Sequence, residues 1–303
     1  MVPLNPNRSL ALALINALIL GCAHSAAADA PVRIMPLGDS ITYGTSSSGT
    51  VGYRRPLYQL LIGVGYGVDF VGSQTNGSPL DFDRNHEGHS GWRADEIRDN
   101  LYSPGTDSGW LKDTPADVIL LHIGTNDISQ GQSAESTRDE ILEILDLIDA
   151  YETAKGVEIW IVLARIVNRS TPLGTLGVRT TLLNSLIQSM AEPRIIAGDR
   201  LVVVDMESAL VYPGDLADTV HPNDTGYGKM AAVWFDALEA LLIPVPNSDH
   251  DGDADVDGSD LAVFIGAFGS ISGDLNYEEK CDLNLSGTIN EDDLALMALG
   301  FGY

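Results

Sequence analysis

Residues 32–42, with the sequence VRIMPLGDSIT, decide how the first part of the chain folds. The mostly apolar run from Val32 to Leu37 is typical of a strand, and Gly38 permits a tight turn at its end. Ser40 follows after one aspartate, so a hydroxyl group is expected at a strand tip. A Gly-Asp-Ser triplet alone is weak evidence for a site, because the same residues also form ordinary turns.

The strand-like pattern returns four more times and alternates with helical patterns. Expected strands cover residues 32–37, 68–72, 117–123, 157–163 and 201–205, and expected helices cover 94–100, 137–151, 178–190 and 225–242. This alternation predicts an α/β fold in three layers, with a five-stranded parallel sheet between two layers of helices. Sheets of this kind place their functional sites at the carboxyl ends of the strands, where Ser40 is expected.

Asp218 and His221 are candidates to act with Ser40. They are three residues apart, so one turn can present both side chains on the same side. Asp218 would accept a hydrogen bond from one imidazole nitrogen while the other nitrogen faces Ser40. A serine, a histidine and a carboxylate are the minimum apparatus for acyl transfer. The competing interpretation is that Asp218 only caps the helix that follows.

Two further residues are candidates to stabilise an oxyanion. Asn126 follows the buried run 118–123, so an amide side chain is expected at a second strand tip. Gly91 lies in a loop that leads into a helix, and its backbone amide can donate at close range because no side chain blocks the approach. The backbone amide of Ser40 would be the third donor. Gly72 is an alternative to Gly91, because it also follows a short apolar run.

Taken together, these blocks resemble the SGNH hydrolases, also called the GDSL family, in which serine, glycine, asparagine and histidine follow in that order. Four sequence segments are similar to those of carbohydrate esterase family 3, which is known for acetylxylan esterases. They are RIMPLGDSIT (33–42), YRRPL (53–57), HEGHSGW (86–92) and HIGTND (122–127). The resemblance covers roughly residues 31–243 and implies a flavodoxin-like fold. It implies these roles: Ser40 as nucleophile, His221 as base, Asp218 as its orienting group, and Ser40, Gly91 and Asn126 as oxyanion donors.

The chain lacks the Gly-x-Ser-x-Gly elbow of α/β-hydrolases, which argues against that rival esterase fold. The resemblance implies a serine esterase that acts on acetylated plant polysaccharide such as xylan, and no cofactor is expected for catalysis. A general short-chain carboxylester hydrolase or lipolytic esterase of the same fold is the first alternative. A noncatalytic, calcium-dependent surface or assembly protein is the second.

At 303 residues the chain is long enough for two domains, and its charge is unevenly distributed. The net charge is -26, from 17 basic and 43 acidic residues, which argues against nucleic acid as a partner. Residues 249–303 contain ten Asp and three Glu but one Lys. The proline-containing segment 244–248 is expected to be a linker, with a catalytic domain at 29–243 before it and an acidic module at 249–303 after it.

Two segments of the acidic module have the residue spacing of a twelve-residue EF-hand calcium loop. The first contains Asp249, Asp251, Asp253, Asp255, Asp257 and Asp260, and the second contains Asp282, Asn284, Ser286, Thr288, Asn290 and Asp293. Gly287 supplies the sharp turn of the second loop, whereas Ala254 stands at that position in the first. Duplicated loops of this kind resemble dockerin modules, which dock onto cohesin domains. The resemblance implies bound Ca²⁺ and a cohesin-type protein partner; a structural calcium module without a partner is the alternative.

The amino terminus is typical of a secretory signal. Arg8 precedes an apolar stretch and then small residues, so residues 1–28 are expected to be a signal peptide that is cleaved before Asp29. Cys22 offers a lipid-anchored alternative, because residues 19–22 resemble a lipoprotein box. With Cys22 removed or lipidated, Cys281 is left without a partner for an intramolecular disulfide.

Four other sets of residues have a structural interpretation as the main one. His122 is expected to be a core histidine, and His86 and His89 are expected to shape their loop rather than bind metal. Arg54 and Arg55 are expected to start a helix and to pair with acidic residues. Trp92 fits equally well with packing beside the loop and with stacking on a sugar ring.

Overall fold

The computed structural model describes residues 31–242, 248, 250, 256, 258–284 and 286–299. Its internal contacts group the chain around two compact units, one spanning Asp29–Ile243 and the other containing Pro244–Tyr303. The expected signal peptide and most of the expected linker and first calcium loop lie outside the described residues. Among the described helices, none combines the length and the apolarity that a membrane crossing requires.

The larger unit is built on a mostly parallel sheet of seven strands in the order β3-β4-β1-β5-β6-β7, with β2 also paired to β1. The strands are β1 (Val32–Gly38), β2 (Val68–Phe70), β3 (Gln74–Thr75), β4 (Asn85–Gly88), β5 (Val118–His122), β6 (Trp160–Arg165) and β7 (Leu201–Asp205). The antiparallel pairing of β3 with β4 departs from the parallel pattern.

The prediction of five strands was therefore incomplete. The five expected strands correspond to β1, β2, β5, β6 and β7, while β3 and β4 were missed. Strand β4 has the polar sequence NHEG and β3 has two residues, so neither carries an apolar run. One edge of β1 pairs with β5, and the other edge pairs with β2 along its first half and with β4 at its end.

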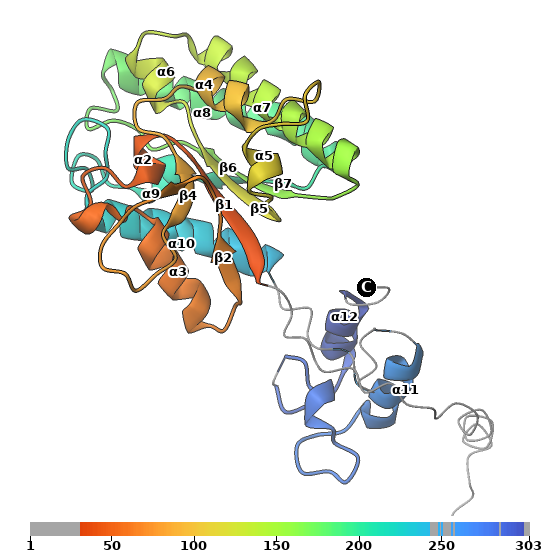
Figure 1. Cartoon of the computed structure of the whole chain (residues 1–303). Coiled ribbons are helices and arrows are strands. Elements are labelled where there is room, and N and C mark those ends of the chain that lie inside the picture. The colour runs from red at the N-terminus through yellow and green to blue at the C-terminus, as the bar shows by residue number, and fades with distance from the viewer. Residues whose placement is uncertain are drawn as a thin grey trace, which may run out of the picture. The chain divides into compact units, whose positions relative to one another are not determined.

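Helices cover both faces of this sheet, as Figure 1 shows. The helices of this unit are α2 (Ser40–Tyr43), α3 (Arg54–Gly63), α4 (Ala94–Leu101), α5 (Trp110–Asp113), α6 (Thr125–Ser129), α7 (Ala134–Lys155), α8 (Thr175–Ala197), α9 (Met206–Ala209) and α10 (Asp224–Leu241), with a 3-10 turn at Ser48–Thr50. Alternate residues of β1 point to opposite faces. Met35 and Leu37 pack in the cluster that contains the buried residues of α4, α7 and α8. Ile34 packs on the other face with residues of α3 and α10.

The carboxyl ends of β1, β4 and β5 meet at one edge of the sheet. Gly38 is paired with Gly88 on one side and with His122 on the other. A Cβ atom on Gly38 would lie 2.2 Å from the carbonyl oxygen of His122, so only glycine permits this approach. Each candidate residue follows one of these three paired residues closely in the sequence. Ser40, Gly91 and Asn126 lie at most four positions after Gly38, Gly88 and His122, respectively.

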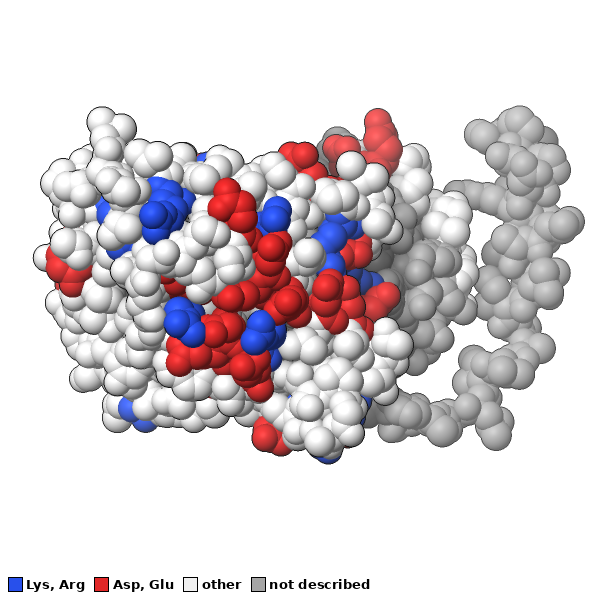
Figure 2. All heavy atoms as spheres, turned by 90° about the horizontal axis from the view of Figure 1, so that it is seen from above, with Lys and Arg blue, Asp and Glu red and all other residues white. Residues whose placement is uncertain are grey.

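Acidic side chains gather on the helical face that Figure 2 shows, and basic side chains lie among them. Among the ion pairs of this unit, Arg98 of α4 pairs with Asp99 and with Glu143 of α7. Arg194 of α8 pairs with Asp146 and Asp149 of α7. Surface ion pairs of this kind add little stability.

The smaller unit contains α11 (Gly258–Ala267), a 3-10 turn at Glu279–Cys281 and α12 (Glu291–Leu299). Among its described residues, the buried core contains Phe264, Ala267, Cys281, Ile289 and Met297. Burial raises the pKa of the Cys281 thiol to about 11, which keeps it protonated.

Candidate active site

Ser40 is the first residue of α2, directly after the turn that ends β1. The Asp39 carboxylate caps this short helix by accepting a hydrogen bond from the Ile41 amide at 2.9 Å. The Ser40 side chain lies at the carboxyl edge of the sheet and the residue is 7% exposed. The structure therefore places the Ser40 hydroxyl group at a strand tip, which is the position predicted from the sequence.

Arg54 holds the end of α2 in place. Its guanidinium is buried and donates to the carbonyl oxygens of Thr42 and Tyr43 at 2.9 and 3.0 Å. It also donates to the carbonyl of Thr50 and to the backbone and side chain of Asn76. The expectation that Arg54 pairs with an acidic residue was wrong, because backbone carbonyls and an amide take the place of a carboxylate here. Arg55 does pair with an acid, Asp81.

Ser40, His221 and Asp218 form a continuous chain of hydrogen bonds. Ser40 Oγ lies 2.8 Å from His221 Nε2, and His221 Nδ1 lies 2.8 Å from Asp218 Oδ2. Asp218 Oδ1 accepts from the backbone amides of Val220 and His221 at 2.9 and 2.8 Å. Partial burial raises the pKa of Asp218, but these amides and the His221 side chain outweigh it, so the pKa lies below its usual value.

The alternative interpretation of Asp218 does not fit the structure, because the cap of α10 is Asn223, whose side chain accepts from the Gly226 amide. The turn that carries His221 is closed by a backbone hydrogen bond from the Ala217 amide to the His221 carbonyl at 2.9 Å. The Ser170 amide donates to the Thr219 carbonyl at 3.0 Å and connects this turn to the loop after β6.

The loop after β4 brings Gly91 to the same edge. The His89 amide donates to the Gly38 carbonyl at 2.8 Å, and the Trp92 amide donates to the His89 carbonyl at 3.2 Å. Gly91 has φ +87° within this turn, a conformation that favours glycine, and a Cβ atom there would meet nothing within 4 Å. Gly72 differs, because a Cβ atom there would lie 2.2 Å from the backbone of His86. Gly72 is therefore a packing glycine, whereas Gly91 has open space where a side chain would lie.

Asn126 is fixed by the same loop. One of its Nδ2 hydrogens is donated to the Trp92 carbonyl at 2.7 Å, which leaves the second hydrogen available. In the described part of the chain, the backbone amides of Ser40 and Gly91 have no internal hydrogen-bond acceptor. The structure thus brings together all five residues that the sequence singled out for this site.

Two buried carboxyl groups beside the site were not predicted. Burial raises the pKa of Asp39, next to Ser40, to about 7, and also raises that of Asp127, next to Asn126, to about 7. Asp127 Oδ1 accepts from the Ala94 amide at 3.0 Å and so connects α6 to the start of α4. The sequence signal for Asp127 was its place directly after Asn126 in the HIGTND block.

Two further histidines near the site, His86 and His122, each accept a hydrogen bond from a backbone amide. His86 is buried, its Nδ1 accepts from the Gly88 amide at 2.9 Å, and burial lowers its pKa to about 2. His122 is also buried, and its Nε2 accepts from the Val167 amide at 3.2 Å. Within the described ranges, no group of three or more His, Cys, Asp or Glu side chains is arranged to hold a metal ion.

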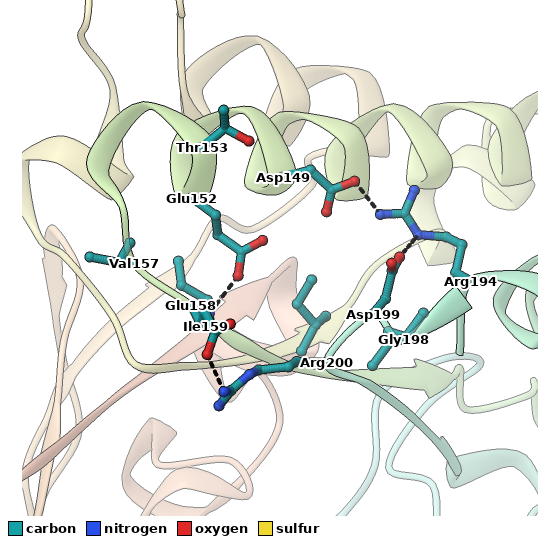
Figure 3. Close-up of a pocket in the computed structure, with 12 residues that line it drawn as sticks. Asp149, Glu152, Thr153, Val157, Glu158, Ile159, Arg194, Gly198, Asp199 and Arg200 are labelled. Atoms are coloured by element: carbon teal, nitrogen blue, oxygen red, sulfur yellow. Dashed lines mark hydrogen bonds and ion pairs between the residues drawn. The ribbon is translucent and has the colours of Figure 1, made fainter. Parts of the chain in front are cut away.

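A cavity of about 390 Å³ lies elsewhere in the unit, and Figure 3 shows its lining. It is bounded by Ile161 and Leu201 of β6 and β7. These residues are paired at the amino ends of the two strands, whereas Ser40 lies at the carboxyl edge. Arg194 and Arg200 in this cavity are both paired with acidic residues. The cavity is therefore separate from the Ser40 site.

Known proteins resemble much of the chain. The GDSL-like Lipase/Acylhydrolase family matches residues 37–229. A multidomain esterase of Ruminococcus flavefaciens is 30% identical over 251 residues, which are 77% of this chain and 32% of that protein. The chain thus spans about a third of the length of this curated relative.

Several solved structures are similar to the chain, among them two carbohydrate esterases and an acetyl esterase. A family 3 carbohydrate esterase of Clostridium thermocellum is 30% identical, with a TM-score of 0.57 over 70% of this chain and 98% of that chain. A carbohydrate esterase family 3 protein of Talaromyces cellulolyticus is 28% identical, with a TM-score of 0.58 over 69% and 97%. An acetyl esterase, solved as a serine-to-alanine mutant with an acetate ion, is 27% identical, with a TM-score of 0.58 over 71% and 99%.

The family match covers more than half of the chain and includes both Ser40 and His221. The residues it spans also carry the hydrogen-bond chain and the two amide-bearing loops described above. The chain belongs to the GDSL-like lipase/acylhydrolase family.

Proposed function

We propose that the unit at 29–243 is a serine esterase that removes acetyl groups from plant polysaccharide such as acetylxylan. The observation that carries this proposal is the hydrogen-bond chain Ser40–His221–Asp218, with 2.8 Å at each of its two side-chain links. A hydroxyl, an imidazole and a carboxylate in this order can generate a nucleophile without any group from outside the chain.

The first half of the proposed reaction transfers the acyl group to Ser40. His221 Nε2 takes the proton from Ser40 Oγ as this oxygen attacks the ester carbonyl. Asp218 keeps the imidazole in the required tautomer and stabilises its protonated form. The negative oxygen of the tetrahedral intermediate receives hydrogen bonds from the Ser40 and Gly91 amides and from Asn126 Nδ2. The sugar alcohol then leaves with the proton that His221 returns.

The second half repeats these steps with water. His221 takes a proton from a water molecule, the resulting hydroxide attacks the acyl-enzyme, and the same three donors hold the second oxyanion. Collapse of this intermediate releases acetate and returns the proton to Ser40. No step requires a cofactor.

The acetyl-polysaccharide substrate is supported by the similar proteins. Two of the solved structures are family 3 carbohydrate esterases and a third is an acetyl esterase. The family as a whole includes lipases and acylhydrolases, so a general short-chain carboxylester hydrolase or lipolytic esterase is the second candidate. A wholly noncatalytic role does not fit a chain that belongs to this family.

We also propose that the smaller unit binds Ca²⁺ and docks onto a cohesin-type protein. The calcium proposal for the second loop is supported by Asp282 and Asp293, its first and last positions, which are both buried. Asp282 accepts from the Ser286 and Gly287 amides at 2.9 and 2.7 Å, and Gly287 has φ +81°. Asp293 accepts from the Asn284 amide at 3.1 Å. Oxygen atoms of carboxylates, amides, hydroxyls and carbonyls are the ligands that Ca²⁺ prefers.

The remaining proposed ligands of the second loop are Asn284, Ser286, Thr288 and Asn290. In the first loop, Asp260 is buried and its Oδ1 accepts from the His250 amide at 2.6 Å, while Asp249, Asp251, Asp253, Asp255 and Asp257 lie outside the described residues. We further propose that the protein is secreted through the signal at residues 1–28; a lipid anchor at Cys22 is the alternative.

Hydrolysis of p-nitrophenyl acetate by the full chain and by Ser40→Ala tests the catalytic proposal. The variant should lose on the order of 10⁴-fold or more in kcat and keep its fold, because the hydroxyl is the nucleophile. Activity within tenfold of the wild type would exclude Ser40 as the nucleophile. The relative rates on acetylated xylan and on esters with longer acyl chains then decide between the two substrate classes.

A further inference from the structure

His89 lies between two tryptophan rings beside the proposed oxyanion donors. Its ring centroid is 4.3 Å from that of Trp92 and 4.6 Å from that of Trp110, with interplanar angles of 24° and 8°. The His89 Nε2 atom is 2.6 Å from Glu87 Oε1, and the His89 side chain is 12% exposed. Stacking and a short hydrogen bond to Glu87 together fix this ring in one orientation.

Two contacts of His89, with Glu87 and with Trp110, connect its ring to the rigid part of the unit. Glu87 is a fully buried residue of β4, paired with Leu37 of β1. Its carboxylate also accepts from the amide and the hydroxyl of Ser73, both at 2.6 Å. Trp110 belongs to α5 and packs against the core cluster under α4 and α7. The His89 ring therefore cannot shift without disturbing either a buried carboxylate or the core.

The same stack determines where two donors lie. Trp92 contributes its ring to the stack and its carbonyl to Asn126 Nδ2, at 2.7 Å. The backbone of His89 closes the turn around Gly91, because the Trp92 amide donates to the His89 carbonyl at 3.2 Å. A displaced His89 ring would move the Trp92 carbonyl and the Gly91 amide together.

We propose that His89 is a positioning residue which, through its stack with Trp92 and Trp110 and its hydrogen bond to Glu87, sets the direction of the Gly91 and Asn126 donors. This inference rests on the proposed function of the site. His89 touches no reacting atom and acts through the loop that it orients. The packing of Trp92 on His89 also favours the structural interpretation of Trp92 over stacking on a sugar ring.

The expected signature is a loss in kcat with little change in KM. Oxyanion donors act mainly on charge that develops in the transition state, so misdirected donors weaken the transition state more than the bound substrate. His89→Ala in the full chain should lower kcat for p-nitrophenyl acetate by roughly 10- to 100-fold and change KM by less than about threefold. An unchanged kcat, or a raised KM alone, would overturn the proposal.

Two further variants separate positioning from general stability. Trp110→Phe keeps an aromatic ring against His89 and should retain kcat within about threefold, whereas Trp110→Ala should resemble His89→Ala. Tyr58→Ala is the matched control, because it removes an aromatic partner of Phe70 from the other face of the sheet. It should lower the unfolding temperature and leave kcat unchanged. Equal kcat losses in Tyr58→Ala and His89→Ala would show a merely structural role for His89.

A double-mutant cycle with Asn126→Ala makes the test decisive. If His89 acts through the oxyanion donors, the combined variant loses much less than the product of the two single losses. A loss equal to that product overturns the proposal. The activity of Ser40→Ala tests the proposed function separately from the role of His89. An active Ser40→Ala variant would refute the proposed function itself. An inactive Ser40→Ala together with a fully active His89→Ala would refute only the role of His89.

Discussion

Replacing His122 by glutamine should make the larger unit less sensitive to acid. His122 is fully buried at the end of β5, and burial lowers its pKa from 6.5 to about 4. Its Nε2 accepts from the Val167 amide, and a glutamine carbonyl oxygen can accept the same hydrogen bond. The variant thus keeps the contact and removes the titrating group.

The sign of the effect follows from the direction of the pKa shift. As pH falls below 6.5, the unfolded chain binds a proton at His122 before the folded one does, so the folded state loses stability until pH reaches the folded pKa of about 4. One pKa unit corresponds to about 1.4 kcal/mol, so the complete effect is roughly 3 kcal/mol. Between about pH 7.5 and about pH 5 the wild type should lose about 2 kcal/mol more than His122→Gln.

Urea unfolding followed by tryptophan fluorescence measures this difference. All four tryptophans, Trp92, Trp110, Trp160 and Trp234, lie before residue 243, so the signal reports the larger unit. Asp39 and Asp127, whose pKa values are raised, titrate in both proteins, and their contributions cancel in the comparison. Thr180→Val, which removes a buried hydroxyl that does not titrate, is the control. Equal losses of stability in wild type and His122→Gln would refute the reasoning.

Three other predictions concern the donors, the Arg54 site and the smaller unit. Asn126→Ala should lower kcat by about 10² to 10³ with a smaller effect on KM, while the exposed control Asn100→Ala should leave both unchanged; a raised KM with constant kcat would instead make Asn126 a substrate-binding residue. Arg54→Met should lower the free energy of unfolding by roughly 2 to 4 kcal/mol, because several buried carbonyls lose their donor; a change below about 0.5 kcal/mol would contradict this. Deleting residues 249–303 should leave p-nitrophenyl acetate hydrolysis nearly unchanged, and calorimetry of the full chain should show about two calcium sites, the first weaker because Ala254 replaces glycine; activity lost on deletion or in chelator would contradict the separation of the two functions, and no calcium uptake at about millimolar metal would remove both loops.

Local motifs made most of the site predictable. Ser40 and Asn126 each follow an apolar run by a few residues, so the strand and the chemical group could be read from one stretch of sequence. Asp218 and His221 are close enough in sequence for one turn to join them. Their meeting with Ser40 depends on the sheet order, which the alternation of strands and helices does not fix and which the structure supplies.

Features that depend on tertiary contacts were not predictable. The acceptors of Arg54 include the backbone carbonyls of Thr42, Asn76 and Arg84, and no sequence pattern marks a carbonyl as an acceptor. His89 and Trp110 are far apart in the sequence, and α5 is too short to give a periodic signal. The polar strand β4 forms because its neighbour β1 offers a free edge, which its own residues do not indicate.

Some helix ends carry a recognisable sequence signal and others do not. The helix expected at 178–190 extends over Thr175–Ala197 and continues through Pro193, a residue that normally breaks a helix interior. The longer α7, expected at 137–151, begins after the Ser133 cap and ends at Gly156, both of which are standard helix signals.

The burial of Cys281 gives the smaller unit a reporter of its own. A protonated thiol inside the core reacts with alkylating reagents only when that core opens. Because the tryptophans report the other unit, thiol labelling and fluorescence can follow the two units separately in one sample. The rate of Cys281 labelling with and without Ca²⁺ therefore measures how strongly the metal closes this core, independently of any esterase assay.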